Sequence, residues 1–164
     1  MVEIIELYKS FDGRQVLRGV NLKAEKGATT VVLGRSGEGK SVLLKHIIGL
    51  LKPDRGRIIV DGIDITYMNE SQLNEIRKTR IGICFQEAAL FDSMSLYDNV
   101  AFPLREHTRL SQRQINERVM DKLQQVGVAQ EAHLFPSEVS GGVRKRAGLA
   151  RAIALDPQIV IFDE

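Results

Sequence analysis

A segment of eight residues, Gly34-Arg35-Ser36-Gly37-Glu38-Gly39-Lys40-Ser41, has the spacing G-x-x-x-x-G-K-[ST]. The run before it, residues 28–33, is short, β-branched and almost uncharged, which predicts a strand buried on both faces. Apolar residues recur at helical spacing after it: Leu43, Leu44, Ile47, Ile48 and Leu51. A strand, a glycine loop and a helix in this order favour an α/β fold.

The residue types in this loop suit the binding of a nucleoside triphosphate. Glycines let successive backbone N–H groups turn inward around phosphates, and the following helix directs its positive N-terminal end at the same anion. We expect Lys40 to reach the β- and γ-phosphates and Ser41 to offer its hydroxyl to Mg²⁺. A glycine-rich turn that fits the spacing by chance is the alternative, and the flanking strand and helix patterns disfavour it.

Composition narrows the class of protein. The 164 residues are 43% hydrophobic, enough for one core, and the net charge of +2 creates no strong field toward nucleic acid or acidic lipid. No apolar run approaches the roughly 18 residues that span a bilayer, and the start lacks the pattern of a signal peptide, so we expect a cytoplasmic protein. The single Cys84 and the scattered His46, His107 and His133 do not have zinc-ligand spacing.

The first half of the chain predicts strands around the glycine loop. Alternating patterns indicate strands at 4–7 and 20–24, and a strand, tight turn and strand over 57–66. A short helix is expected near 70–78. A further apolar run, 81–85, ends directly before Gln86, where an open α/β sheet places ligand contacts. We therefore assign residues 1–86 to a nucleotide-binding core with antiparallel N-terminal strands.

The second half predicts a helical subdomain over residues 87–155. Two capping boxes begin at Ser95 and Ser111. One apolar stripe ends at Gly127, and a second runs from Val143 to Ala154. Residues 156–164 then return to the core as a buried strand, and this last element is expected to be incomplete.

Two segments in this half carry candidate chemistry. Asp163 follows the apolar strand and would hold the hydration shell of Mg²⁺, while Glu164 would orient and deprotonate the attacking water. Ser140 is a good N-cap, and Gly141 and Gly142 expose backbone N–H groups at a helix start, which makes a second anion site. Because one nucleotide needs one such loop, the second site suggests a nucleotide held by another copy of the chain. An ordinary capped helix is the alternative for Ser140.

The order of the glycine loop, Gln86, residues 140–142 and residues 159–164 resembles the nucleotide-binding subunit of ATP-binding cassette (ABC) transporters, over the whole chain. The resemblance implies a P-loop NTPase fold with a RecA-like core sheet, and ATP and Mg²⁺ as cofactors. It implies that Phe11, or else Tyr8, stacks on adenine, and that nucleotide contacts extend from the loop through Val42.

The resemblance also implies roles for further residues and for partners. Gln86 would sense the γ-phosphate and contact Mg²⁺ together with Ser41 and Asp163, and Lys40, Gln86 and Glu164 would form the catalytic set. Two subunits would pair head to tail, with each ATP between the glycine loop of one and Ser140 of the other. The segment after Gln86 would receive a helix of a membrane-spanning permease. One departure is Val143, where many members of the family have glutamine after the two glycines.

Within the family, Gly39–Val42, Phe85–Ser93 and Ser140–Arg146 are similar to the lipid-handling Mla/Mce branch. This similarity implies ATP-driven transport of phospholipid or another hydrophobic molecule at the cytoplasmic face of the inner membrane, with a possible lipid-transfer subunit as partner. DNA-repair members insert a long coiled coil between Gln86 and Ser140, and this chain shows no sustained heptads there. Translation-associated members carry two cassettes and basic linkers, and we expect no nucleic acid partner.

A small-molecule P-loop kinase is a third possibility, but it leaves Ser140–Gly142 and Glu164 without a role. Cassettes of the ABC family continue after the acidic strand with a turn, another strand and a histidine that contacts the γ-phosphate, which this sequence lacks. We expect the sequence to be a fragment of a longer cassette. The expectation of ATP hydrolysis therefore applies to the intact subunit.

Overall fold

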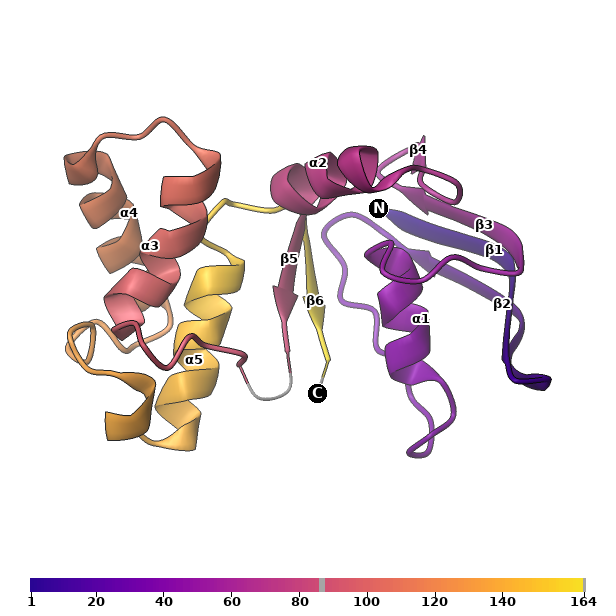
Figure 1. The fold of residues 1–164 in the computed structure, drawn as a ribbon, viewed down its shortest axis with the longest axis horizontal. Helices are drawn as coiled ribbons and strands as arrows, with labels where there is room; N and C mark the ends of the chain where they lie inside the picture. Colours follow the sequence, from indigo (N-terminus) through magenta and orange to yellow (C-terminus); the bar gives the residue numbers. More distant parts are fainter. Residues whose placement is uncertain (86–87, 164) are drawn as a thin grey trace. The chain divides into compact units, whose positions relative to one another are not determined.

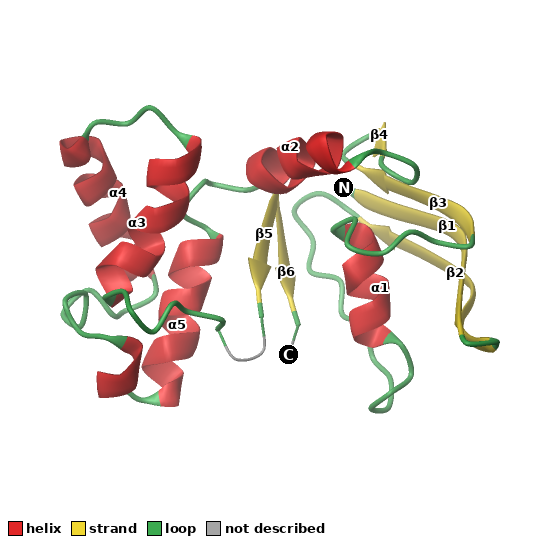
Figure 2. Cartoon of the chain, viewed as in Figure 1, coloured by secondary structure: helices red, strands yellow, loops and turns green. Residues whose placement is uncertain are grey.

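The computed structural model describes residues 1–85 and 88–163, which form two compact units, Met1–Ile76 and Arg77–Glu164 (Figures 1 and 2). Each unit contains its own sheet and its own buried side chains. Within the described residues no helix is both long and apolar enough to cross a membrane. The functional division at residues 86 and 155 remains a prediction.

The first unit contains an antiparallel sheet in the order β2-β1-β3-β4 (Figure 2). The strands are β1 (Val2–Phe11), β2 (Arg14–Ala24), β3 (Arg55–Val60) and β4 (Ile63–Asp64). An Asp-Gly pair joins β1 to β2 and another joins β3 to β4, and all four of these turn residues have φ between 47° and 80°. Such left-handed pairs match the twist of a two-residue hairpin. The strands expected at 4–7, 20–24 and 57–60 and the turn at 61–62 are thus confirmed, whereas the strand expected over 63–66 covers only Ile63–Asp64.

Residues 28–33 do not form the strand that their composition predicts. They are irregular, and Val31 and Leu33 are 70% and 88% exposed. A strand is held by hydrogen bonds to a neighbouring strand, and the described strands pair only as β2-β1-β3-β4 and β5-β6. The prediction was wrong for this structure. A β-branched, apolar composition favours a buried strand, but a strand also needs a neighbouring strand to pair with, and composition does not identify one.

Helix α1 (Lys40–Ile47) follows the glycine loop and packs against β3. Its apolar stripe continues to Leu51, but the helix ends earlier because Gly49 adopts φ 69°. The Gly49 N–H donates to the carbonyl of His46 at 3.0 Å, and the Leu50 N–H donates to that of Lys45 at 2.8 Å. This pair of bonds is a Schellman motif, which terminates a helix at a left-handed glycine.

His46 is a fully buried side chain on α1. Its Nδ1 lies 2.7 Å from the carbonyl oxygen of Val42, so this nitrogen carries the proton and donates it. The Nε2 atom has no hydrogen-bond partner among the described residues. Burial lowers the pKa of His46 below its ordinary value of 6.5, and nearby Lys9 lowers it further, whereas the Val42 bond and Asp54 oppose the shift.

The lowered pKa of His46 predicts a pH-dependent free energy of unfolding. The unfolded chain binds a proton at this residue below about pH 6.5, whereas the folded chain does so only at lower pH, so stability is complete above 6.5 and falls as the pH drops through that value. The slope from one proton is at most about 1.4 kcal/mol per pH unit. Urea titrations between pH 5 and 7 are expected to show a shallower slope for His46→Gln than for wild type. The same substitution at the exposed His107 is the matched control.

The second unit contains a two-stranded parallel sheet and three helices. The pair is β5 (Ile81–Cys84) with β6 (Ile159–Phe162), in a register that places Cys84 opposite Phe162. Helix α2 (Glu70–Arg80) leads into β5 from the end of the first unit. A Cβ at Gly82 would lie 2.3 Å from the carbonyl oxygen of Ala152, so β5 accommodates the end of a helix only because residue 82 is glycine.

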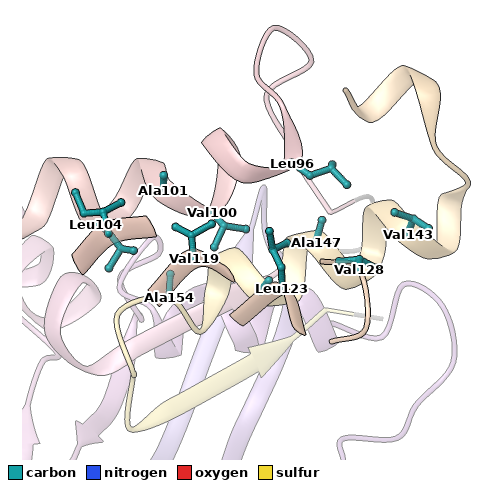
Figure 3. Packing of buried hydrophobic residues seen from close by; sticks show 12 residues of the cluster. Leu96, Val100, Ala101, Leu104, Val119, Leu123, Val128, Val143, Ala147 and Ala154 are labelled. Carbon is teal, nitrogen blue, oxygen red and sulfur yellow. The ribbon is translucent and has the colours of Figure 1, made fainter. Parts of the chain in front are cut away.

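The helices of this unit are α3 (Leu96–His107), α4 (Gln112–Gln125) and α5 (Gly141–Ala152), with a short 3₁₀ turn at Pro136–Glu138. Ser95 and Ser111 cap α3 and α4 as predicted, and α4 has the full reciprocal capping box. The three helices pack through one apolar cluster (Figure 3). Its members come from both predicted stripes and from α3, and include Val100, Val119, Leu123, Ala147 and Ala154.

Candidate functional site

The glycine loop connects residue 33 to α1 in the first unit. Gly37 has φ 81° and Gly39 has φ 96°, backbone conformations that side chains disfavour. A Cβ at Gly39 would lie 2.8 Å from Cγ1 of Val16 and 3.3 Å from Cδ2 of Leu17. Glycine at position 39 is therefore required twice, for the turn and for the close approach of the loop to β2.

Lys40 is the first residue of α1, and its ammonium group lies over the start of the loop. The Nζ atom donates to the carbonyl of Gly34 at 2.8 Å and to that of Arg35 at 3.1 Å. Gly39 is the N-cap of α1 and provides no side-chain cap, so the positive end of the helix is not neutralised by a cap. A cation and a helix N-terminus thus meet at one loop, which is the arrangement that binds phosphate.

Glu38 places a carboxylate inside the same loop. The Arg35 N–H donates to its Oε2 at 2.7 Å, and a Cβ at Gly34 would lie 3.0 Å from that oxygen. The carboxylate therefore closes the loop on itself, with its oxygen against the backbone at residue 34. It also adds a negative charge where a phosphate chain would bind.

We predict that Glu38→Gln raises the affinity for ATP. Glutamine retains an acceptor for the Arg35 N–H and removes the charge. At about 8 Å and an effective dielectric of about 40, one unit charge repels another by about 1 kcal/mol, or about five-fold in affinity. Calorimetric titration is expected to show this gain at low salt, a smaller gain at high salt, and a larger gain for ATP than for ADP. The control Glu25→Gln, outside the loop, is expected to change neither affinity; a Glu38→Gln variant that binds more weakly would contradict the electrostatic account.

A hollow of about 330 Å³ lies beside the loop in the first unit. Its lining residues are Arg14, Gln15, Val16, Arg18, Gly37 and Glu38. The two arginines make this a cationic surface next to a predicted phosphate site, and no motif pointed to them. Their only sequence signal is the hairpin turn at Asp12-Gly13, which returns β2 along β1 and so brings its first residues to the loop.

The two candidates for the adenine contact, Phe11 and Tyr8, both lie on β1. Phe11 is 40% exposed and pairs across the hairpin with Arg14, which lines the hollow. The Tyr8 hydroxyl donates to Glu6 at 3.3 Å, and the Tyr8 ring lies 5.3 Å from the guanidinium of Arg55. The Phe11 ring has a similar contact, with the Lys9 ammonium 5.5 Å from its centre. The assignment of the adenine contact to Phe11 stays a prediction.

The second glycine segment begins α5. Ser140 is the N-cap, and its Oγ accepts a hydrogen bond from the Val143 N–H at 3.4 Å. Gly141 and Gly142 have no left-handed φ. Apart from the adjacent residues and the backbone of the helix itself, the nearest atom to an added Cβ would be Arg144 Nη2, 3.7 Å away, at Gly141 and Ser140 Oγ, 3.9 Å away, at Gly142. The described residues therefore offer no structural reason for glycine here, although two glycines in a first helical turn weaken it.

Asp163 follows β6 at the carboxyl end of the parallel pair. Its backbone N–H donates to the carbonyl of Cys84 at 3.0 Å, so the ends of β5 and β6 lie side by side. Gln86 and Glu164, predicted to act beside Asp163, lie outside the described residues. The loop, Phe11 and the hollow belong to the first unit, and Ser140–Gly142 and Asp163 belong to the second.

Known proteins are similar to this chain over nearly its whole length. The profile of the ABC transporter family matches residues 17–164. The chain is 53% identical over 163 residues to the probable ribonucleotide transport ATP-binding protein mkl of Mycobacterium leprae, covering 99% of this chain and 47% of that protein. It is 47% identical over 164 residues to the intermembrane phospholipid transport system ATP-binding protein MlaF of Haemophilus influenzae, covering all of this chain and 62% of that protein.

A solved structure has the same fold. The dimeric, post-hydrolysis form of the ATP-binding cassette MJ0796 bound to ADP and Pi superposes with a TM-score of 0.91 at 30% identity, covering 99% of this chain and 73% of that one. This likeness confirms the predicted P-loop NTPase fold. The chain spans about half to three-fifths of the length of the two curated relatives.

Proposed function

Because the chain belongs to the ABC transporter family, we propose that it is the ATP-binding part of a transporter, where it couples ATP binding and hydrolysis to membrane transport. The phosphate loop supports ATP binding: Gly37 and Gly39 turn its backbone, and the Lys40 ammonium lies over its start. In this proposal the triphosphate contacts residues 34–42, and Phe11 stacks on adenine beside the cationic hollow of Arg14 and Arg18.

The observation that carries the proposal is the open glycine pair at the start of α5. Gly141 and Gly142 have room for side chains and ordinary backbone angles, so their lack of side chains serves something outside the described residues. A phosphate chain that approaches the helix N-terminus requires such bare backbone. We propose that this phosphate belongs to ATP held in the loop of a second copy, so that two chains pair head to tail. A small-molecule kinase would leave the glycine pair without a purpose.

Hydrolysis in this proposal uses Mg²⁺ and five side chains near the γ-phosphate. Ser41 is exposed at the start of α1 and Asp163 follows β6, and their hydroxyl and carboxylate oxygens are the hard donors that suit Mg²⁺. Ser41 and Asp163, with Gln86, would hold the ion, which neutralises phosphate charge when bound. Glu164 would orient the attacking water, and Lys40 would stabilise charge on the phosphates.

The proposed partners are a second ATP-binding subunit and a membrane-spanning permease, with a lipid-transfer subunit as a further candidate. The proposed location is the cytoplasmic face of the inner membrane, as a peripheral subunit. The dimeric form of MJ0796 supports the pairing. No nucleic acid partner is proposed, and the modest net charge of +2 agrees with that.

The proposed cargo is phospholipid or another hydrophobic molecule. The similarity to the phospholipid transport protein MlaF supports it, together with the segments 39–42, 85–93 and 140–146. The relative mkl is named for ribonucleotide transport, which makes nucleotides a competing cargo. Stimulation of the ATPase of the assembled transporter by phospholipid vesicles, but not by ribonucleotides other than ATP, would support the lipid cargo; the opposite pattern would contradict it.

The proposed function is tested by titrating the full-length protein with ATP and Mg²⁺ in a calorimeter and by measuring phosphate release. Saturable binding that depends on Lys40, together with turnover that depends on Ser140, would support it. If the rate of phosphate release rose linearly with protein concentration, the rate per chain would not depend on pairing. That result would contradict the shared site.

A further inference from the structure

Arg151, in the last turn of α5, binds the backbone of Ala88 and Ala89. Its Nη2 donates to the carbonyl of Ala88 at 2.9 Å, and its Nη1 donates to the carbonyl of Ala89 at 2.9 Å. The guanidinium carbon also lies 5.7 Å from the centre of the Phe91 ring. The side chain is half-buried, and this burial lowers the pKa of the guanidinium, which still remains charged. The planar guanidinium group thus donates hydrogen bonds to two successive backbone carbonyls and contacts the Phe91 ring.

The two alanines bound by this guanidinium group have a strained backbone. Ala88 has φ 61° and Ala89 has φ 45°, a left-handed conformation that non-glycine residues adopt rarely. Strain of this kind persists only where the surroundings impose it, and it concentrates at functional segments. The long sequence separation between Arg151 and these alanines means that no local preference produces the contact.

Gly148 supports the same contact one helical turn earlier. A Cβ at position 148 would lie 2.8 Å from Cβ of Ala88 and 3.2 Å from its carbonyl oxygen. Positions 148 and 151 are three apart and so share one face of α5. This face therefore combines a bare backbone, which lets Ala88 approach, with a guanidinium that bonds its carbonyl.

A second polar side chain, Asn99, binds the other end of the segment, at Phe91. Asn99 on α3 is fully buried; its Oδ1 accepts from the Phe91 N–H at 2.8 Å, and its Nδ2 donates to the carbonyl of Phe91 at 3.1 Å. The Phe91 ring also packs against Phe102 of α3, with 5.1 Å between ring centres. Residues 88–91 are therefore held by polar side chains from two helices of the same unit.

We propose that Arg151 is a positioning residue that couples residues 88–91 to the Ser140–Gly142 end of α5. The proposal rests on the function proposed above, in which Ser140 completes the nucleotide site of a second copy. Helix α5 has 12 residues and is about 18 Å long. Because Arg151 lies in its last turn and Ser140 at its N-cap, a displacement of residues 88–91 moves the serine end with it.

The test uses the full-length protein and two arginines of α5. Arg146 is the matched control, because it also donates to a backbone carbonyl, that of Gly127 at 3.1 Å, but makes a single exposed bond. For Arg151→Met we expect a kcat for ATP hydrolysis about ten-fold lower than that of the wild type, with an unchanged Kd for ATP. A change of this size is typical when the coupling between two sites is lost. Arg146→Met is expected to retain the wild-type kcat, and Arg151→Lys, which can bond one carbonyl, is expected to fall between them.

Hydrogen exchange provides a readout that does not depend on turnover. In Arg151→Met we expect faster amide exchange over residues 88–91 and unchanged exchange over residues 143–150 of α5. Gly148→Ala is the second variant, because it displaces Ala88 without removing the guanidinium, and it is expected to raise the same exchange and lower kcat. Equal exchange and equal kcat in Arg151→Met and Arg146→Met would overturn the proposal. If instead the wild-type protein neither bound nor hydrolysed ATP, the proposed function would fail, whatever the exchange data showed.

Discussion

Replacing Lys40 by alanine is expected to lower the affinity for ATP by at least about a hundred-fold, which corresponds to about 2.7 kcal/mol. The ammonium lies over the start of the glycine loop, where it donates to the carbonyls of Gly34 and Arg35. A charged hydrogen bond to phosphate in such a loop is stronger than a neutral one. The substitution removes this bond and leaves the Glu38 carboxylate as the only charged side chain bonded within the loop among the described residues.

The fold is expected to survive this substitution. Both bonds of the Lys40 ammonium are exposed, and α1 is anchored by Leu43 and Ile47, which are buried. Lys45→Ala, an exposed lysine on the same helix, is the matched control and is expected to retain wild-type affinity. Calorimetric titration with ATP and thermal unfolding of both variants test the prediction. An ATP affinity for Lys40→Ala within a few-fold of the control would mean that the loop does not bind the triphosphate.

Ser140→Arg is expected to have the opposite profile: wild-type affinity for ATP, but no ATP-driven pairing and no turnover. Position 140 is the N-cap of α5, beside two glycines that leave open space. A long cationic side chain there would fill the space that a second subunit's ATP needs. The phosphate loop lies in the first unit and keeps all of its own contacts, so binding by the single chain is unaffected.

Loss of the cap itself must be separated from loss of pairing. An N-cap serine contributes about 1 kcal/mol to its helix. Ser111 is the matched control, because it caps α4 with the same backbone angles, φ −65° and ψ 158°, as Ser140. Ser111→Arg is expected to lose similar stability while retaining ATP-driven pairing. Sedimentation with and without ATP distinguishes the two variants; pairing by Ser140→Arg as strong as that of Ser111→Arg would contradict the role of residues 140–142.

Local chemistry made much of the fold predictable. The hairpins at Asp12-Gly13 and Asp61-Gly62, and the helix starts at Ser95, Ser111 and Ser140, each depend on residues within a few positions of one another. Turn and cap preferences act over that range, so the sequence pattern contains them. The glycine loop is predictable for the same reason, since its three glycines and its lysine lie within the short segment Gly34 to Lys40.

Features that depend on distant partners were missed or wrongly predicted. Residues 28–33 have the composition of a buried strand, but burial requires a neighbour that composition does not name. Arg14 and Arg18 line a hollow with Gly37 only because the hairpin brings β2 to the loop. The guanidinium of Arg151 binds the backbone carbonyls of two alanines more than sixty positions away, and no sequence pattern near Arg151 or near these alanines predicts the contact.

The central claim, that the glycine loop of one chain and residues 140–142 of another form a single site, is tested most directly by mixing the two inactive variants. In a mixed pair, the Ser140→Arg chain provides an intact loop and the Lys40→Ala chain provides an intact Ser140, so one of the two sites is whole. An equal mixture is expected to regain up to about half of wild-type ATP turnover, because neither variant pairs with itself in response to ATP and each mixed pair has one whole site of two. Turnover equal to the sum of the two variants measured separately would contradict the claim.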